Sequence, residues 1–367
     1  DDPERALCDV VSHAVQHGDQ QHVSAGPTYR WIHRVWYEGG GFGWLLLPLS
    51  ALYGLVAACR RGLYRSGAIR SRRISVPVIV VGNITAGGTG KTPVVVWLAQ
   101  ELRRRGFRPG IVSRGYGGSH SRSPMRVDEY SDPHVVGDEP VLLARRSGCP
   151  VIVDADRVRA AEMLAEDGVD VVISDDGMQH YRLGRDYEIC VIDGPRGLGN
   201  RRLLPAGPLR ESARRLDEVD QLLVNGRMRS HAPTTVTEQN ALPFELLATE
   251  VSRLNGSLTR AIERFAGTTV HAVAGIGNPR RFFDLLRSHG VQVIEHARAD
   301  HAPLSDSDLA FGDDFEIFMT EKDAVKLGHK VRDGYWYVPV ELSMDPAHAL
   351  PLIEQIDSRL RDWQGAQ

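Results

Sequence analysis

Residues 76–93 read Val-Pro-Val-Ile-Val-Val-Gly-Asn-Ile-Thr-Ala-Gly-Gly-Thr-Gly-Lys-Thr-Pro. The β-branched run at 76–81 is typical of a strand that is buried in a parallel sheet. The apolar pattern from Val94 to Arg105 predicts a helix. A strand, a glycine-rich loop and a helix in this order are the context of a Walker A phosphate-binding loop. The stretch therefore predicts an α/β fold of the P-loop type.

The residue types in the loop fit phosphate chemistry. Its glycines let backbone N–H groups approach phosphates without a clash from Cβ. Lys91 brings a compact positive charge to the β- and γ-phosphates, and Thr92 offers a hydroxyl to Mg²⁺. The motif begins with glycine where this chain has Thr85, so the loop must start in a conformation that a β-branched residue tolerates. We expect the nucleotide to be bound by Thr85, Gly87, Gly88, Thr89, Gly90, Lys91 and Thr92.

A pair of acidic residues follows a second predicted strand. Residues 169–174 read Val-Asp-Val-Val-Ile-Ser and are followed by Asp175 and Asp176. Carboxylates at the end of a strand beside a P-loop hold Mg²⁺ and its waters. Two adjacent acids alone are more often a solvated turn. With the P-loop upstream, we interpret them as a Walker B site for Mg²⁺.

Further strands complete a doubly wound, mostly parallel sheet with helices between most of them. They are predicted at 109–112, 150–153, 188–192 and 221–224. Ligands of such sheets bind outside the carboxyl ends of the strands. The glycine-rich segment 113–118 follows the strand at 109–112 and should border the site. The sequence Gly-Asp-Glu-Pro at 137–140 opens a helix and places Asp138 near its N-terminus.

The chain divides into four predicted parts. Residues 1–37 form a polar tail, and residues 38–73 form an apolar, membrane-associated helix with a basic flank. Residues 74–230 form the P-loop domain, and residues 231–367 form a smaller α/β domain. In this last part we expect strands at 270–274, 291–295, 316–319 and 335–340 and helices at 279–288 and 350–360. Its Gly-Ile-Gly-Asn at 275–278 is interpreted as a strand–helix turn and not as a dinucleotide site.

The segment from Gly39 to Cys59 contains no charged side chain. A membrane span needs about 20 apolar residues, and Pro48 and Gly54 weaken this one as a straight helix. Six arginines and no acid lie between positions 60 and 73, after the apolar run, which favours the cytoplasmic side and anionic headgroups. We predict a dipping or surface anchor on a membrane. The alternative is a buried hairpin helix in a soluble core.

Net charge, cysteine spacing and the guanine-binding motif limit the partners and nucleotides that we expect. The formal net charge of −3 gives no overall basic field, so we expect no nucleic-acid partner. The four cysteines are far apart and do not form the spacing of a metal knuckle. A guanine reader Asn-Lys-x-Asp is missing: residues 225–228 lack it, and Thr-Glu-Lys-Asp at 320–323 has its lysine one place late. ATP is therefore favoured, and no obligate protein partner is evident.

Three functions remain open from the residues alone. The first is a kinase. The second is a nucleotide-hydrolysing switch, for example in metal insertion, although the cysteine and histidine spacing that would favour it is missing. The third is a membrane adaptor with a structural P-loop. The intact set of Lys91, Thr92, Asp175 and Asp176 argues against the third.

Six segments together carry a resemblance to a known family. They are residues 81–93, Ser-Arg-Gly-Tyr-Gly-Gly (113–118), Gly-Asp-Glu-Pro (137–140), Asp-Asp-Gly-Met-Gln-His (175–180), Leu-Pro-Ala-Gly-Pro-Leu-Arg-Glu (204–211) and Met-Thr-Glu-Lys-Asp (319–323). In this order they resemble the tetraacyldisaccharide 4'-kinases of lipid A synthesis, from about Trp31 to near the C-terminus. Threonine at position 85, in place of the first glycine of the Walker motif, resembles a trait of that family.

The resemblance implies a reaction and a place. The γ-phosphoryl group of ATP would pass to the 4'-hydroxyl of a tetraacyl glucosamine disaccharide 1-phosphate. This acceptor is a membrane lipid, which implies the cytoplasmic face of the inner membrane of a Gram-negative-type bacterium. The enzyme would be peripheral or monotopic there.

The resemblance also implies roles. Asp138 resembles the base for the sugar hydroxyl, His301 resembles the histidine paired with it, and Lys91 keeps its P-loop role. Because His301 lies in the second domain, the active site is predicted between the domains, where closure can assemble it. By position alone, Arg114, Tyr116 and Arg210 are candidate contacts to the glycolipid. The residues implied around Mg²⁺ are Thr92, Asp175, Asp176, Gln179 and Glu211.

Overall fold

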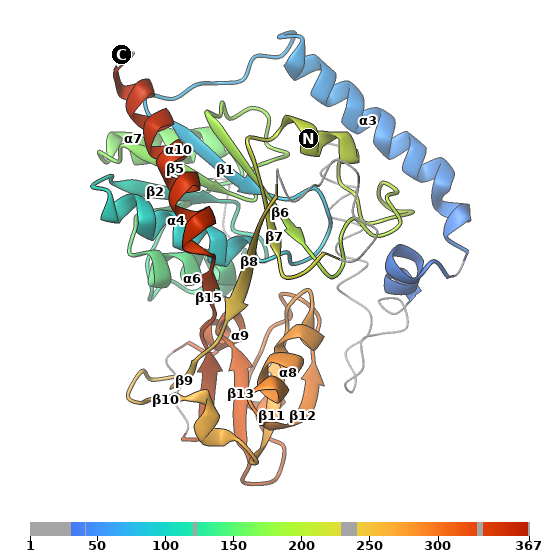
Figure 1. Ribbon diagram of the computed structural model, residues 1–367, viewed down its shortest axis with the longest axis vertical. Coiled ribbons are helices and arrows are strands. Elements are labelled where there is room, and N and C mark those ends of the chain that lie inside the picture. Colours follow the sequence, from blue (N-terminus) through green and yellow to red (C-terminus); the bar gives the residue numbers. More distant parts are fainter. Residues whose placement is uncertain (1–30, 41, 120–122, 229–240, 329–332, 366–367) are drawn as a thin grey trace.

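The computed structural model of the chain describes residues 31–40, 42–119, 123–228, 241–328 and 333–365. Most of the predicted tail at 1–37 lies outside these residues. The described strands form two sheets, and the larger lies above the smaller in Figure 1.

The larger sheet has nine strands in the order β15-β8-β7-β6-β1-β5-β2-β4-β3. Seven are parallel, and only the edge strands β3 and β15 are antiparallel to their neighbours. The predicted doubly wound, mostly parallel sheet is thus confirmed. Its strands are β1 (Val78–Gly82), β2 (Pro109–Ser113), β3 (Met125–Val127), β4 (Val151–Val153), β5 (Val171–Asp175), β6 (Tyr187–Asp193), β7 (Gln221–Asn225), β8 (Ala241–Leu247) and β15 (Glu341–Ser343).

Helices cover both faces of this sheet. Side chains alternate along β1, so Ile79 and Val81 pack into one core layer while Val78 and Val80 pack into the other. The first layer contains α4, α6 and α10, and the second contains α7. The helices around this sheet are α3 (Leu47–Arg65), α4 (Lys91–Arg104), α5 (Pro133–Val136), α6 (Asp138–Ser147), α7 (Arg157–Glu166) and α10 (Pro346–Gly365). Short helical turns are η1 (Arg34–Glu38), η2 (Gly43–Leu46) and η3 (Ala213–Glu218).

The register of the central strands brings two predicted motifs together. β1 pairs with β5 in parallel, and Val81 lies opposite Asp175. The loop after β1 and the acidic pair at the end of β5 therefore leave the same edge of the sheet. This is the edge at which ligands of open α/β sheets bind.

The smaller sheet has six strands in the order β10-β9-β14-β13-β11-β12. Its core is built around Trp336 and Phe318, which are fully buried and tilted 49° to each other. Four of the strands are parallel, as their long crossovers require. The elements are β9 (Glu250–Arg253), β10 (Thr259–Ala261), η4 (Ile262–Phe265), β11 (Thr269–Ala274), α8 (Pro279–Ser288), β12 (Gln292–Ala297), η5 (Asp306–Leu309), β13 (Glu316–Thr320), α9 (Glu321–Lys326) and β14 (Tyr335–Val338).

The chain crosses between the two sheets twice. The larger unit therefore does not end at residue 230, where the sequence predicted the boundary between the two domains. β8 pairs with β7, and β15 returns from the smaller unit to pair with β8. α10 then packs Leu352, Ile353 and Ile356 into the core of the larger sheet. Hydrogen bonding and apolar burial thus assign 241–247 and 341–365 to the larger unit.

Helix α3 lies on the outside of the larger unit, as the blue helix in Figure 1 shows. With η2 it runs from Gly43 to Arg65 and is, by length and composition, the one described helix apolar enough to cross a membrane. Only 17% of its most apolar window is buried, which does not fit a core helix. Large side chains on it are exposed, among them Trp44, Leu45, Leu52 and Leu55.

The inner face of α3 is tied to one loop. Ser50 Oγ donates to the carbonyl oxygen of Leu203 at 2.8 Å, and the Tyr53 hydroxyl donates to that of Arg210 at 3.0 Å. In the turn before α3, Trp36 Nε1 donates to the carbonyl oxygen of Pro205 at 3.0 Å. The loop at 203–210 thus connects the exposed helix to the edge of the sheet described above.

Candidate active site

The phosphate loop lies between β1 and α4, and its backbone explains its residues. Gly87 and Gly90 have φ of 104° and 95°, a left-handed region that favours glycine. Thr85 forms an antiparallel bridge with Leu209, and the N–H of Ala86 donates to the carbonyl oxygen of Pro208 at 2.8 Å. The loop therefore starts as extended backbone, in which a β-branched residue fits.

Lys91 is the first residue of α4, and Thr92 is the second. Lys91 Nζ lies 3.2 Å from Asn83 Oδ1 and 3.5 Å from Asp176 Oδ1. The Asn83 amide in turn donates to the carbonyl oxygen of Thr85 at 2.8 Å. Sequence reasoning missed Asn83, although it stands within the quoted loop. The loop also holds the Thr89 hydroxyl, which is buried and has no hydrogen-bond partner among the described residues.

The acidic pair at the end of β5 is held by arginines. Asp176 has a φ of 47°, which is unusual for a residue other than glycine and is found at functional sites. Arg210 Nη1 donates to Asp176 Oδ2 at 3.1 Å. The buried Arg157 donates to the carbonyl oxygens of Asp175 and Asp176 at 3.3 and 3.1 Å. Sequence reasoning missed Arg157, because nothing near it in the chain marks it.

The two neighbouring carboxyl groups have opposite pKa shifts. Burial, together with the charges of Glu139 and Asp176, raises the pKa of Asp175 to about 7. Burial also acts to raise the pKa of Asp176, but Lys91, Arg210 and Arg157 hold it well below its usual range. The site therefore has one carboxylate, Asp176, whose cations outweigh its burial, and one carboxyl, Asp175, at which Lys91 and Arg157 do not outweigh burial and the neighbouring acids. The second is the kind of group that a cation would ionise.

Gln179 and Glu211 meet beside the phosphate loop. The Gln179 amide donates to Glu211 Oε1 at 2.7 Å and to the carbonyl oxygen of Asn83 at 3.1 Å. The Tyr181 hydroxyl donates to Glu211 Oε2, and Arg215 Nε lies 3.7 Å from the same oxygen. Glu211 is thus fixed by neighbours on both sides.

The predicted Mg²⁺ ligands fit this ion in chemistry but are not gathered into a cage. Within the described residues, no group of three or more His, Cys, Asp or Glu side chains is placed to hold a metal ion. The donors offered by Thr92, the carboxylates and Gln179 are nevertheless all oxygen atoms, which Mg²⁺ prefers. Mg²⁺ usually takes one or two carboxylates and completes its shell with phosphates and waters. The raised pKa of Asp175 agrees with a cation bound there.

A second cluster joins the two units. His301 Nδ1 lies 2.9 Å from Asp138 Oδ1, and the two residues belong to different units. Asp138 opens α6, while His301 follows β12 and has a φ of 58°. The Tyr116 ring meets His301 edge-on at 5.0 Å. The structure thus brings together two residues that only the family resemblance had paired.

Asp138 is ionised despite its burial. Burial acts to raise its pKa, but Lys322, the hydrogen bond from His301 and Lys326 hold it well below the usual range. Asp138 Oδ2 is buried and accepts no hydrogen bond from the residues that the structure describes. This oxygen faces the Lys326 ammonium group at 3.7 Å.

The pKa of His301 is raised, although burial alone would lower it. Burial and Lys322 act to lower the pKa of His301, but the hydrogen bond to Asp138 and the charges of Asp300 and Asp138 outweigh them and raise it.

The two clusters are neighbours, since Glu139 acts on the pKa of Asp175 and also accepts from Lys322 at 3.0 Å.

The predicted glycolipid contacts divide in the structure. Tyr116 lies on His301, and Arg210 is paired with Asp176. Arg114 is half-buried on the same loop as Tyr116. Tyr116 thus lies beside the Asp138–His301 pair and Arg210 beside the acidic pair, and their contact with a glycolipid stays a prediction.

The smaller unit also touches the phosphate loop. A Cβ added at Gly277 would lie 2.5 Å from the backbone nitrogen of Gly88. Arg196 Nη2 donates to the carbonyl oxygen of Gly277 at 2.7 Å, and Arg281 of α8 donates to Asn225 Oδ1. The turn at 275–278 is thus a strand–helix turn, and it also rests on the loop that we expect to bind phosphate.

This contact gives a testable expectation. Gly277→Ala should raise the KM for ATP about tenfold, because the turn must move away from the phosphate loop and overpacking costs ~1–3 kcal/mol. Steady-state kinetics with varied ATP checks this. Gly365→Ala is the matched control, since an added Cβ there meets no atom within 4 Å. An unchanged KM in Gly277→Ala would mean that the turn does not constrain the loop.

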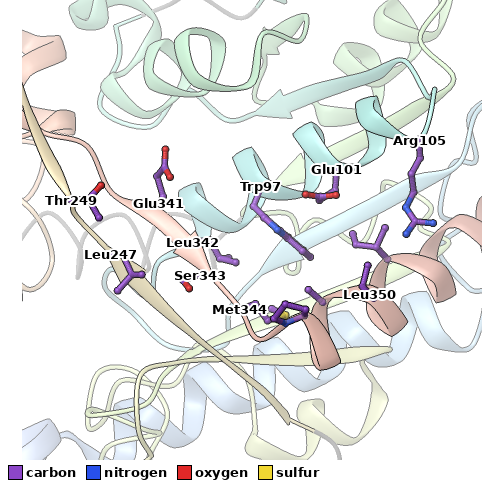
Figure 2. A pocket seen from close by; sticks show the side chains of 13 residues that line it. Trp97, Glu101, Arg105, Leu247, Thr249, Glu341, Leu342, Ser343, Met344 and Leu350 are labelled. Carbon is purple, nitrogen blue, oxygen red and sulfur yellow. The ribbon is translucent and has the colours of Figure 1, made fainter. Parts of the chain in front are cut away.

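A separate hollow of about 480 Å³ lies away from these clusters. Figure 2 shows its lining side chains, with Trp97 and Glu101 from α4 and Arg105 directly after it facing Leu342 and Met344 from the segment that returns to the larger sheet. None of the P-loop, acidic-pair or Asp138–His301 residues lines it. We do not assign it to the nucleotide.

Comparisons with known proteins agree with one another. The family model of Tetraacyldisaccharide-1-P 4'-kinase matches residues 42–361. A tetraacyldisaccharide 4'-kinase from Alkalilimnicola ehrlichii is 53% identical over 302 residues, which cover 82% of this chain and 89% of the relative. One from Nitrosococcus oceani is 46% identical over 328 residues, which cover 88% of this chain and 94% of the relative.

A solved structure has the same fold. It is the crystal structure of the "apo" form of LpxK from Aquifex aeolicus in complex with ATP. The TM-score is 0.72 at 27% identity, and the match covers 87% of this chain and all of the other.

Proposed function

This chain belongs to the tetraacyldisaccharide 4'-kinase family, and from that premise we propose how its residues transfer the γ-phosphoryl group of ATP to the 4'-hydroxyl of a tetraacyl disaccharide 1-phosphate. The observation that carries the proposal is the juxtaposition of two clusters. Lys91 and the acidic pair form one, and Asp138 with His301 forms the other. Glu139 links them, because it acts on Asp175 and accepts from Lys322.

Binding and orienting the triphosphate is the task of the phosphate loop. The backbone N–H groups of residues 87–90 and the start of α4 provide partial positive charge for the phosphates. Lys91 adds a full positive charge. Its contact with Asp176, at 3.5 Å, holds that charge at the edge of the sheet. Phosphoryl transfer depends mainly on such positioning and charge neutralisation.

The metal ligands that we propose for Mg²⁺ are Thr92, Asp175, Asp176, Gln179 and Glu211. When bound, Mg²⁺ supplies charge that neutralises the phosphate oxygens. The all-oxygen donor set and the raised pKa of Asp175 support this assignment. Tyr181 and Arg215 hold Glu211 through its Oε2, while Gln179 contacts its Oε1.

The proton of the acceptor hydroxyl passes to Asp138 in this proposal. Asp138 Oδ1 already accepts from His301 and from the backbone N–H of Glu139, both at 2.9 Å. Oδ2 is the oxygen that accepts the hydroxyl proton as the phosphoryl group arrives. The ionised state of Asp138 and the buried position of Oδ2 support this role.

We propose that α3 brings the enzyme to its acceptor at the cytoplasmic face of the inner membrane. Its exposed leucines suit the acyl region, and the arginines after it suit anionic headgroups. Ser50 and Tyr53 fasten the helix to the loop that ends in Arg210 and Glu211. A lipid-bound α3 would therefore hold the catalytic edge of the sheet near the headgroup of the acceptor.

The double substitution Leu52→Glu/Leu55→Glu should lower partitioning onto vesicles at least about 100-fold, since each buried leucine contributes ~1.5–3 kcal/mol. The two side chains are 57% and 61% exposed, so the fold should be retained. Sedimentation with anionic liposomes measures the change. Tyr130→Glu, at a residue that is 71% exposed on another surface, serves as the control. If the double variant bound vesicles as well as the wild type, α3 would not be the segment that contacts the membrane.

The transfer itself is tested with γ-labelled ATP and Mg²⁺ in detergent, with and without the tetraacyl disaccharide 1-phosphate. We expect the label to enter the lipid. The rival function is a nucleotide switch, in which ATP is consumed equally with or without lipid and no label reaches it. That second result would overturn the proposal.

A further inference from the structure

Lys322 is buried between the two units and uses all three of its N–H donors there. Its Nζ lies 3.0 Å from Glu139 Oε1, 3.0 Å from Asp300 Oδ1 and 3.1 Å from His301 Nε2. The side chain is only 12% exposed. An ammonium group has three donors and no acceptor, so these partners saturate it. Glu139 and Asp300 are the chain neighbours of Asp138 and His301, so Lys322 contacts both sides of the pair.

The contact with Lys322 opposes protonation of His301 Nε2, against the nearby carboxylates that raise the pKa of the ring. Because Lys322 Nζ can only donate, His301 Nε2 must be the unprotonated nitrogen that accepts. The ring hydrogen of the neutral imidazole is then on Nδ1, where it donates to Asp138 Oδ1 at 2.9 Å. With both ring nitrogens engaged, Asp138 Oδ2 is the acceptor of the pair that is left for a substrate hydroxyl.

Building on the kinase function given above, we propose that Lys322 is a positioning residue that keeps His301 as the neutral Nδ1–H tautomer and thereby keeps Asp138 able to accept the proton of the acceptor hydroxyl. Lys322 stands in the Thr-Glu-Lys-Asp segment that fails as a guanine reader. In the structure this segment instead forms the start of α9 and places Lys322 between the two units.

Electrostatics around the ring supports this role. The charged and titratable groups near it come from α6, α9, the loop that carries His301 and the loop after β2. They are Asp138, Glu139, Asp300, Lys322, Asp323, Lys326 and Tyr116. Asp323 is satisfied by Lys326 at 2.8 Å and by the backbone of Gly275. Lys326 lies 3.7 Å from Asp138 Oδ2, on the side of the carboxylate that does not contact the ring.

Removing the positive charge of Lys322 changes the protonation of the pair. Lys322 lowers the pKa of His301 and that of Asp138. Without it both pKa values rise, and the pair holds an additional proton up to a higher pH. Activity requires that Asp138 can accept a proton, so the acidic limb of the pH–rate profile should move upward.

The test compares Lys322→Gln and Lys322→Arg with the wild type in pH–rate profiles of lipid phosphorylation. Gln keeps a donor for Nε2 but no charge, and Arg keeps the charge. We expect the acidic limb of Lys322→Gln to move up by about one pH unit or more, with kcat recovering at high pH and the KM for ATP unchanged. Lys322→Arg should keep the acidic limb near its wild-type position. Arg359→Gln, on an exposed side chain, controls for loss of one surface charge.

The ring itself is observed by ¹H–¹⁵N correlation spectra of protein labelled at histidine, assigned with His301→Gln. Wild type should show the Nδ1–H tautomer, and Lys322→Gln should show a protonated ring at pH values where the wild-type ring is neutral. A pH-independent loss of activity in both variants, with an unchanged His301 signal, would overturn the proposal and leave Lys322 as a structural tie. Failure of the wild type to label the lipid would instead overturn the kinase function.

Discussion

Lys91→Ala should lower kcat for lipid phosphorylation by about 10³-fold, which is the loss seen when one preorganised charge is removed from a transition state. By transition-state arithmetic this equals ~4 kcal/mol. Lys91 Nζ is held by Asn83 Oδ1 at 3.2 Å and by Asp176 at 3.5 Å, so its charge is aimed before the nucleotide binds. Alanine removes the charge and also leaves Asp176 with Arg210 and Arg157 as its cations.

The measurement is a single-turnover assay with saturating ATP and lipid, which separates transfer from binding. Arg104→Ala is the control, because Arg104 lies on the same helix with an exposed side chain paired to Glu101. Thermal unfolding should be nearly unchanged in both variants. A kcat for Lys91→Ala within about threefold of wild type would contradict a role for this charge in the transition state.

Asp138→Asn should lower kcat by about 10²–10⁴-fold, the range for loss of a general base. Asparagine has nearly the same shape, but its amide no longer accepts a proton. ATP binding should be retained, because Asp138 has no contact with the phosphate loop among the interactions of the described residues. The loss should therefore appear in kcat and not in the KM for ATP.

Asp284→Asn, at an exposed carboxylate on α8, is the matched control for this substitution. His301→Gln should give a smaller loss in the same direction, since it removes the partner but not the base. If Asp138→Asn transferred the label at the wild-type rate, the proton would have to leave by another route. The proposed role of the Asp138–His301 pair would then be wrong.

Local motifs predicted the part of the site that is close in sequence. The strand, loop and helix around Lys91 are a continuous segment, and the acidic pair follows its own strand, so short patterns found both. Their meeting follows from sheet topology, since the carboxyl ends of parallel strands share one edge. β1 and β5 are neighbours, with Val81 opposite Asp175.

Contacts between distant segments were beyond reach of sequence patterns. Glu139 and Lys322 are 183 positions apart, and no pattern around Lys322 indicates that it meets His301. The return of β15 and α10 to the larger sheet was missed for the same reason, because a short strand does not reveal its partner. His301 was found only through the family resemblance, and Arg157 and Asn83 were not found.

The most direct measurement counts ATP consumed and lipid phosphate formed in the same reaction, with the tetraacyl disaccharide 1-phosphate and with its 4'-deoxy analogue. We predict one lipid phosphate for each ATP consumed with the natural acceptor, and neither product nor stimulated ATP consumption with the analogue. Phosphorylation of the 4'-deoxy lipid, or ATP consumption that is independent of the acceptor, would contradict transfer to the 4'-hydroxyl at this site.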